Sequence, residues 1–376
     1  MTFADVPTSS EFESVRTGIR KLMEHFPLDY WAEQDRQRTF PKAFFDAVAQ
    51  AGYFGTLIPQ AYGGAEAGPA VASVIVEEIN RAGGDATAVN AQMTICGTVA
   101  RDGSESQRAC LPEVAAGKLR FLAVAATEPD SGADMSSLQS TARRDGDAWV
   151  LDAQKVFISM AEHTERMLLL MKAEEGPTVF LVEPQQLGEA LEIRPVELMS
   201  NRMTTMVFID GARVPDSARV GPAGKGLACL GKGFFARRIL AAAECIGNAR
   251  FLLDRSLEHA RVRRTFDRPI GQNQGVQYPL AQAYAKVEAA DLMRWDALRA
   301  VASGSPDAGG RSAMAKVLAS EAAWETARAA LTTFGAWGLS GEYHVERKLR
   351  ESSVYVFNNM LLSYLSHTVL DLPRAF

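Results

Sequence analysis

Residues 139–159 read QSTARRDGDAWVLDAQKVFIS. Short stretches rich in apolar and β-branched residues alternate here with turn signals, and Asp145-Gly146-Asp147 between two of them is typical of a β-hairpin. Stretches of the same kind lie on both sides, at residues 121–126, 166–171, 178–182 and 206–209. About seven short strands within roughly 110 residues predict a small antiparallel β-barrel or sandwich, which we place at residues 121–232.

The chain on either side of this β-rich region has a helical pattern. Before it, Phe12, Val15, Ile19 and Met23 recur at intervals of three and four residues, as on one face of an amphipathic helix. After it, long stretches without proline predict four helices, at residues 234–260, 284–302, 311–332 and 347–370. We therefore predict an α+β protein with an N-terminal helical domain (residues 1–120), a middle β-domain (residues 121–232) and a C-terminal four-helix bundle (residues 233–376).

Composition and charge limit the function. The chain has 376 residues, of which 47% are hydrophobic and 23% charged, and its formal net charge is -5. These values are ordinary for a globular enzyme and provide no basic stripe for nucleic acid. The apolar stretches are too short to span a bilayer and the N-terminus lacks the apolar core of a secretion signal, so we expect a cytoplasmic protein without a membrane partner. The four cysteines and five histidines show no metal-ligand spacing, so we expect no metal.

Three motifs carry a more specific signal. They read TEPDSGAD at residues 127–134, KVFIS at residues 155–159 and RRTFDRPIGQNQ at residues 263–274. IPQAYGG at residues 58–64 interrupts the helical pattern and predicts a loop. In this order, and together with that loop, the three motifs resemble the acyl-CoA dehydrogenase superfamily. The resemblance covers nearly the whole chain and implies that family's three-domain fold, with FAD as the cofactor.

The resemblance also implies which residues contact FAD. The family's counterparts of Thr127 and Ser159 contact the isoalloxazine ring, and the aromatic residue at Phe157 stacks beside it. Arg263 stands where the family places an arginine for the FAD pyrophosphate of a neighbouring subunit, and a planar guanidinium matches phosphate oxygens. Phe266 and Gln274 belong to the same turn, near that cofactor. The contact between subunits implies a homotetramer or homodimer. The alternatives are that the strand residues serve only the core of the β-domain and that Arg263 lies on a solvated, arginine-rich turn.

The family's reaction removes an α-proton and a β-hydride from an acyl thioester, and the usual proton acceptor is missing here. The family's glutamate follows a helix start that reads VERKLRE at residues 345–351 of this chain. Ungapped alignment places Asn359 at the glutamate, and a gapped alignment supplies no carboxylate either. Asparagine cannot accept a proton at neutral pH, although its amide can donate a hydrogen bond.

Some relatives place the base on the first helix of the bundle, just before an arginine that corresponds to Arg238. That position holds Arg237 here, so it lacks a carboxylate as well. The nearest acid is Glu244, two turns further along the same face of the helix. A buried carboxylate in an apolar stretch can act as a base or bind a polar substrate group, so Glu244 is our candidate catalytic residue. Its alternative role is an ion pair within the bundle, and Arg238 is the candidate contact of the thioester.

Three functions remain open. The first is α,β-desaturation of an acyl thioester, carried by CoA or by a carrier protein, with a relocated base. The second is a different flavin reaction, that of an oxidase or monooxygenase in specialised metabolism, which needs no α-proton acceptor. The third is a non-catalytic subunit that forms a heteromer with an active homologue. We favour the first function because the cofactor motifs are retained.

Overall fold

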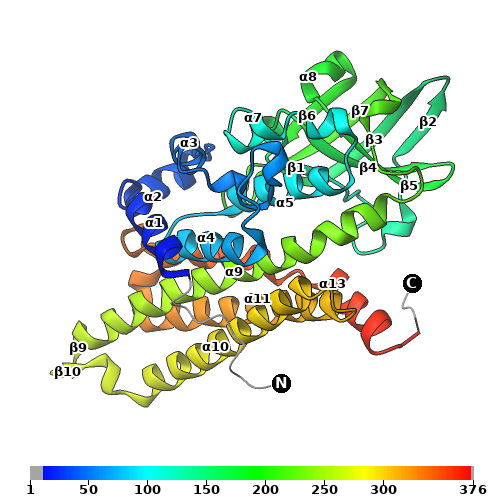
Figure 1. Ribbon diagram of the computed structural model, residues 1–376. Helices are drawn as coiled ribbons and strands as arrows, with labels where there is room; N and C mark the ends of the chain where they lie inside the picture. The colour runs from blue at the N-terminus through cyan, green and yellow to red at the C-terminus, as the bar shows by residue number, and fades with distance from the viewer. Residues whose placement is uncertain (1–11, 374–376) are drawn as a thin grey trace. The chain divides into compact units, whose positions relative to one another are not determined.

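The computed structural model describes residues 12–373 (Figure 1). Its chain divides into two compact units. The sheet unit comprises residues 38–68 and 87–237, and the helical unit comprises the described residues up to 37, residues 69–86 and those from 238 onward. The long helix α9 (Gly226–Val262) begins in the sheet unit and ends in the helical unit.

One sheet of eight strands organises the sheet unit. Seven strands follow the order β6-β7-β3-β2-β4-β5-β8, and β1 pairs with β4. The strands are β1 (Ala123–Ala125), β2 (Thr141–Asp145), β3 (Ala148–Ser159), β4 (Met167–Ala173), β5 (Gly176–Val182), β6 (Leu191–Pro195), β7 (Thr204–Pro215) and β8 (Arg219–Val220). Along the chain, helices are followed by a sheet and then by further helices, which confirms the predicted fold class.

The pairing of the strands is mixed rather than wholly antiparallel. Strand β1 pairs with β4 in parallel, and Thr141 of β2 lies opposite Lys172 of β4 in a second parallel contact. Two parallel neighbouring strands need a long connection between them. The connection from β1 to β4 contains the β2–β3 hairpin. The predicted hairpin itself is confirmed: Asp145 pairs with Ala148 across a turn in which Gly146 has a φ of +63°, a conformation that glycine adopts without steric cost.

The remaining elements of the sheet unit are short helices and the loop predicted at residues 58–64. The helices are α3 (Lys42–Gln50), α5 (Thr87–Asp102), α6 (Glu105–Arg108), α7 (Leu111–Ala115) and α8 (Pro184–Leu187). The loop folds back on itself, because a Cβ atom on Gly64 would lie 1.9 Å from the carbonyl oxygen of Ile58. Only glycine fits at such a close approach of two backbone segments.

Long helices make up the helical unit. They are α1 (Glu13–Met23), α2 (Leu28–Gln37), α4 (Gly68–Arg81), α9, α10 (Gln274–Ala302), α11 (Ala308–Phe334), α12 (Val345–Ser353) and α13 (Asn359–Tyr364). Helices α10 and α11 run side by side (Figure 1). Small side chains let them approach, since Ala315, Ala319, Ala322 and Ala323 of α11 are all buried in the shared core.

The fourth predicted bundle helix is broken, where the sequence predicted one helix at residues 347–370. Helix α12 gives way to a 3₁₀ turn at Val354–Val356, and α13 begins only at Asn359. The ammonium of Lys316 on α11 donates to the carbonyl of Tyr355 and to the side chain of Asn358, at 2.6 Å each. Hydrogen bonds from another helix therefore replace those that a continuous helix would make here.

A buried ion network ties four helices of this unit together. Glu77 of α4 is fully buried, and arginines from three other helices surround it: Arg16 of α1, Arg250 of α9 and Arg294 of α10. Burial acts to raise the pKa of Glu77, but the three guanidinium groups overcome it and hold that pKa far below the usual range. The carboxylate is therefore permanently charged, and it needs its partners.

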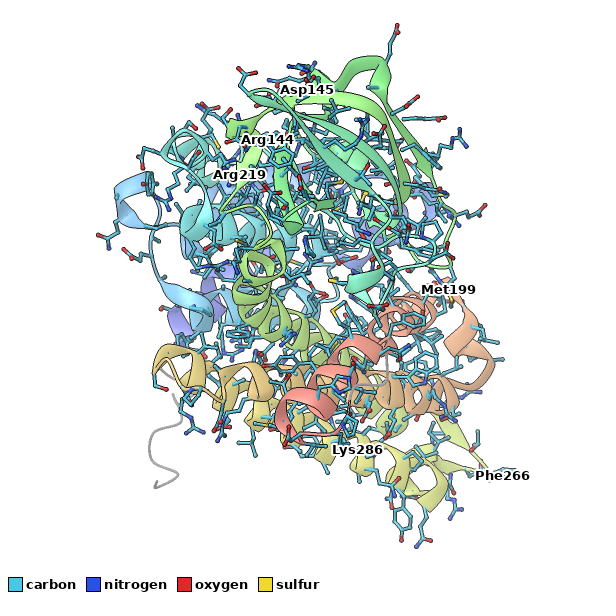
Figure 2. All side chains as sticks on the ribbon, turned by 90° about the vertical axis from the view of Figure 1, so that its right-hand side faces the viewer. Arg144, Asp145, Met199, Arg219, Phe266 and Lys286 are labelled. Carbon is cyan, nitrogen blue, oxygen red and sulfur yellow. The ribbon has the colours of Figure 1, made fainter. Side chains whose placement is uncertain are left out.

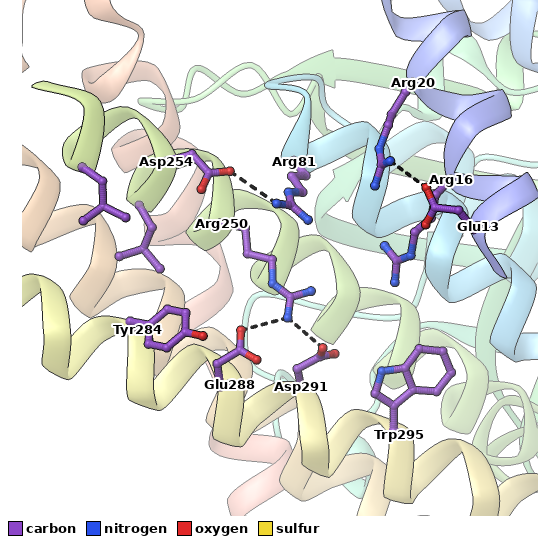
Figure 3. Close-up of a pocket in the computed structure, with 12 residues that line it drawn as sticks. Glu13, Arg16, Arg20, Arg81, Arg250, Asp254, Tyr284, Glu288, Asp291 and Trp295 are labelled. Carbon is purple, nitrogen blue, oxygen red and sulfur yellow. Dashed lines mark hydrogen bonds and ion pairs between the residues drawn. The ribbon is translucent and has the colours of Figure 1, made fainter. Parts of the chain in front are cut away.

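The same network reaches a cavity of about 520 Å³ between α1, α4, α9 and α10 (Figure 3). Arg250 donates to Glu288 at 3.0 Å and to Asp291 at 2.8 Å, and Arg81 lies 3.6 Å from Asp254. Cations and anions alternate along its walls, so the charges compensate one another.

Two negative findings apply to residues 12–373. None of their helices has the length and hydropathy needed to cross a membrane. None of their His, Cys, Asp and Glu side chains form a group of three or more that is placed to hold a metal ion.

Candidate functional site

A break in the pairing of β3 brings Thr127 and Phe157 together. The register between β3 and β7 shifts between Lys155 and Ile158, and within this bulge the N–H of Val156 donates to the carbonyl of Thr127 at 3.0 Å. Phe157 follows with a φ of +56°, which is unusual for a residue with a side chain. Its ring is 63% exposed, so the strain presents a flat apolar surface outward instead of burying it.

Ser159 completes this group at the end of β3. It pairs with Thr204 of β7, and both Ser159 and Thr127 are half-buried. The structure therefore brings together the three residues predicted for the isoalloxazine ring, Thr127, Phe157 and Ser159, within one unit.

These residues fit a flavin ring. An exposed aromatic ring favours stacking against a flat heterocycle, and two hydroxyl groups can hydrogen-bond to its edge. Gly132, in the segment after Thr127, has no atom within 4 Å of the position a Cβ would take, so the surface beside this segment is open. Ala133 stands where the resemblance expects a serine, so one hydroxyl donor of the family's pattern is absent.

A second group of predicted cofactor residues lies in the helical unit, where α9 turns into α10. Arg263 follows α9 and is exposed, and Gln274 opens α10 and is exposed as well. Between them, strands β9 (Arg264–Thr265) and β10 (Arg268–Pro269) form a two-residue hairpin with Phe266 and Asp267 at its tip.

Phe266 is the most exposed large apolar residue of this turn. Its side chain is 94% exposed and projects from the end of the hairpin (Figure 2). Both tip residues have left-handed backbone conformations, with φ of +49° at Phe266 and +62° at Asp267. An exposed aromatic on a strained turn is typical of a contact residue rather than a core residue.

The loop that carries Asn359 contains no carboxylate. Residues 352–364 include neither Asp nor Glu. The acids nearest before this stretch are engaged: Glu346 pairs with Arg350, and Glu351 pairs with Arg347. Asn359 is exposed at the first turn of α13, and its predecessor Asn358 is buried.

Glu244 is buried in α9, with 4% of its surface exposed. Burial lowers the pKa of Lys316, and electrostatic attraction to Cys245 and to Glu244 opposes that shift. Sequence patterns did not single out Lys316, because a lone lysine on an alanine-rich helix gives no signal.

Arg238 lies on α9 against Tyr364 of α13. Its guanidinium sits 4.8 Å from the centre of the Tyr364 ring and bonds only weakly, at 3.4 Å, to the carbonyl of Gly309. Burial lowers the pKa of Arg238, and attraction to Tyr364 opposes that effect. Tyr364 lies within the helix predicted at residues 347–370, but no motif in the sequence singled it out.

Comparison with known proteins agrees with these observations. Family models described as the N-terminal, middle and C-terminal domains of acyl-CoA dehydrogenase match residues 9–118, 123–211 and 224–357. Acyl-CoA dehydrogenase FadE12 of Mycobacterium tuberculosis is 31% identical over 100% of both chains. A 3-(aryl)acrylate reductase of Clostridium sporogenes is 30% identical over 92% of this chain and 94% of its own.

A solved structure extends the likeness to three dimensions. The structure of a glutaryl-coenzyme A dehydrogenase in complex with glutaryl-CoA superimposes with a TM-score of 0.91 at 28% identity, covering 100% of this chain and 98% of that one. Relatives matched along their full length and the three family models together show that the chain belongs to the acyl-CoA dehydrogenase family, as an FAD-dependent flavoprotein oxidoreductase.

Proposed function

We propose that this protein desaturates an acyl thioester between its α and β carbons. The observation that carries the proposal is the exposed Phe157, two residues before Ser159, in a strand bulge whose backbone bonds to Thr127. When bound, FAD supplies the two-electron oxidation that such a reaction needs. Thr127 and Ser159 orient the flavin ring by hydrogen bonds, and Phe157 covers part of it from water.

The turn at the end of α9 contributes to a second copy. Arg263, Phe266 and Gln274 are exposed at one end of the helical unit, and the resemblance assigns them to the FAD of a neighbouring subunit. A guanidinium matches phosphate oxygens, and an exposed aromatic can stack on a base. We therefore propose a homotetramer or homodimer in which this turn reaches the partner's cofactor.

The α-proton needs an acceptor within the chain. We propose Glu244 for this role, since the loop position holds Asn359 and the position before Arg238 holds Arg237. Arg238 contacts the thioester, where its positive charge favours the enolate-like charge that builds on the carbonyl oxygen. The loss of a general base costs about a hundredfold to ten-thousandfold in rate, so a dehydrogenase without the loop glutamate requires a replacement.

Anaerobic titration with acyl thioesters tests the desaturation. The wild-type holoprotein, mixed with a panel of acyl-CoA and acyl-carrier-protein substrates, is expected to lose its flavin absorption with at least one of them. Glu244→Gln is expected to bind the same thioester without bleaching. Equal bleaching rates of the two proteins would remove Glu244 from the mechanism while leaving the desaturation intact.

A second candidate follows from the burial of Glu244. A carboxylate that is 4% exposed and attracts the Lys316 ammonium serves well as a counter-ion, which leaves the chain without a proton acceptor. The function is then either a flavin reaction that needs none, as in an oxidase or monooxygenase, or that of a non-catalytic subunit paired with an active homologue. The first predicts oxygen consumption driven by a reductant, and the second predicts little FAD until the homologue is added.

A further inference from the structure

An ion pair is buried next in sequence to the proposed flavin contacts. Nζ of Lys155 lies 2.7 Å from Oε1 of Glu128. Lys155 is fully buried and Glu128 is 4% exposed. Glu128 directly follows Thr127, and Lys155 lies two residues before Phe157. None of the roles proposed above uses either residue.

Both partners are held by further hydrogen bonds. Lys155 also donates to the carbonyl of Leu170 on β4 at 2.6 Å. Glu128 accepts from the backbone N–H groups of Gln139 at 2.6 Å and of Ser140 at 3.1 Å. An ammonium has only donors and a carboxylate only acceptors, so the pair connects β3, β4, the segment after β1 and the segment before β2 at one point.

Energetics separate a positioning role from a stabilising one. Burial lowers the pKa of Lys155. For Glu128, burial acts to raise the pKa, but hydrogen bonds from Lys155, Ser140 and Gln139 hold it below the usual range. Removing two charges from water costs about as much as their attraction returns, and an apolar pair would stabilise such a core equally well. What the ion pair adds is geometry, because its hydrogen bonds admit only one arrangement of the segments.

The ion pair of Lys155 and Glu128 fixes the positions of the proposed flavin contacts. The pair draws the segment of Thr127 against β3, where the carbonyl of Thr127 accepts from the N–H of Val156 at 3.0 Å. That bond forms where the register between β3 and β7 shifts, and Phe157 follows it in a left-handed conformation.

We propose that Lys155 and Glu128 are positioning residues for FAD, whose buried pair sets the spacing between Thr127 and Phe157. This inference rests on the flavin contacts proposed for those two residues, and it is independent of which thioester the protein oxidises.

Binding of FAD to the apoprotein tests the role. Lys155→Met, Glu128→Gln and Glu128→Asp are compared with wild type by the FAD Kd, the visible absorption bands of bound flavin and the melting temperature of the apoprotein. Lys155→Met and Glu128→Gln are expected to raise the Kd by about tenfold or more and to shift the bands, because small misplacements of contact groups are costly. Glu128→Asp keeps the charge but shortens the side chain, so its FAD Kd is expected to lie between those of wild type and Glu128→Gln. If Lys155→Met does not fold, the two Glu128 variants test the positioning role.

Asp216→Asn provides a matched control in the same sheet. Asp216 accepts from the indole of Trp149 at 2.8 Å and from Arg219 at 3.1 Å, in a cluster that includes no proposed flavin contact. It is expected to lower the melting temperature while the Kd and the bands stay at wild-type values.

Two results would overturn the positioning role. One is a wild-type Kd and spectrum in Lys155→Met and Glu128→Gln. The other is a rise of the FAD Kd in Asp216→Asn as large as in Lys155→Met and Glu128→Gln, when the melting temperatures of the three variants fall by the same amount. Phe157→Ala distinguishes a failure of the positioning role from a failure of the proposed flavin contacts. A wild-type FAD Kd in Phe157→Ala refutes the flavin contacts. A raised Kd in Phe157→Ala, together with wild-type Kd values in Lys155→Met and Glu128→Gln, refutes only the positioning role.

Discussion

The ammonium of Lys316 donates a hydrogen bond of 2.6 Å to the side-chain oxygen of Asn358, and the amide of Asn358 donates in turn to Ser320 at 2.9 Å. These bonds hold the loop before α13 through buried groups. The next residue, Asn359, is exposed and takes no part in them. The backbone at the position of the family's glutamate is therefore fixed independently of the side chain that stands there.

Asn359→Glu is expected to restore a proton acceptor without disturbing the fold. If the ungapped alignment is correct, Asn359→Glu accelerates flavin bleaching by a reactive acyl thioester in the Glu244→Gln protein, which lacks the proposed acceptor, by about a hundredfold or more, the usual contribution of a general base. Stopped-flow absorbance under anaerobic conditions measures the rate. Asn359→Gln, which has the same length and no charge, is the control in the same Glu244→Gln background and is expected to stay at the rate of Glu244→Gln alone. An equal rate in all three proteins would show that position 359 does not face the α-carbon.

Glu77→Gln is expected to destabilise the protein by about 3–5 kcal/mol, because it leaves Arg16, Arg250 and Arg294 with one negative charge fewer in a buried site. Urea unfolding at neutral pH, followed by circular dichroism, gives the change. Lys42→Gln removes an exposed pair with Asp46 instead and is expected to cost less than about 1 kcal/mol. A cost for Glu77→Gln as small as that of Lys42→Gln would contradict the importance of the network.

Asp216 gives the sheet unit a pH dependence. Hydrogen bonds from Arg219 and then Trp149 lower the pKa of Asp216 to about 2. Because the folded pKa lies below the unfolded value, the carboxylate contributes stability above about pH 4, and that contribution is lost as the pH falls toward 2. The difference in unfolding free energy between wild type and Asp216→Asn is therefore expected to be largest near neutral pH and to shrink between pH 4 and pH 2. A difference that is constant over this range would contradict the assignment.

Asp267→Gly is expected to stabilise the hairpin at the end of α9. Asp267 has a φ of +62°, where glycine is free of strain, and the bond from Arg264 goes to the backbone carbonyl that glycine retains. The gain is at most about 1 kcal/mol, since glycine also loses more entropy on folding. Asp267→Ala, which keeps the steric strain and loses the polar side chain, is expected to be less stable than wild type. Thermal unfolding of the three proteins checks the order, and a glycine variant below the alanine variant would refute it.

Local signals in the sequence predicted most of the fold. The hairpin at Gly146 was predicted correctly because its turn depends on a backbone conformation that only a few residues favour. Strand β6 was missed although Glu192 and Arg194 alternate with apolar residues along it, because it has only five residues and ends at Pro195. The short stretches at residues 148–151 and 155–159 belong to one strand, β3, whose pairing with β7 shifts register at Asp152.

The candidate site was predicted less completely. Thr127, Phe157 and Ser159 could be named from motifs, and the structure places them within one unit. The break of the last bundle helix could not be predicted, because it depends on a hydrogen bond from Lys316 to a carbonyl 39 residues further along the chain. The same holds for the pair of Lys155 and Glu128, whose partners lie 27 residues apart.

The flavin face of the sheet unit is the central claim, and FAD titration of the apoprotein tests it most directly. Wild type is expected to bind one FAD per chain, and Phe157→Ala to bind at least about tenfold more weakly, as expected when a stacked aromatic contact of about 1.5 kcal/mol is lost. Equal affinity of Phe157→Ala and wild type, at equal melting temperatures of the two apoproteins, would contradict the account.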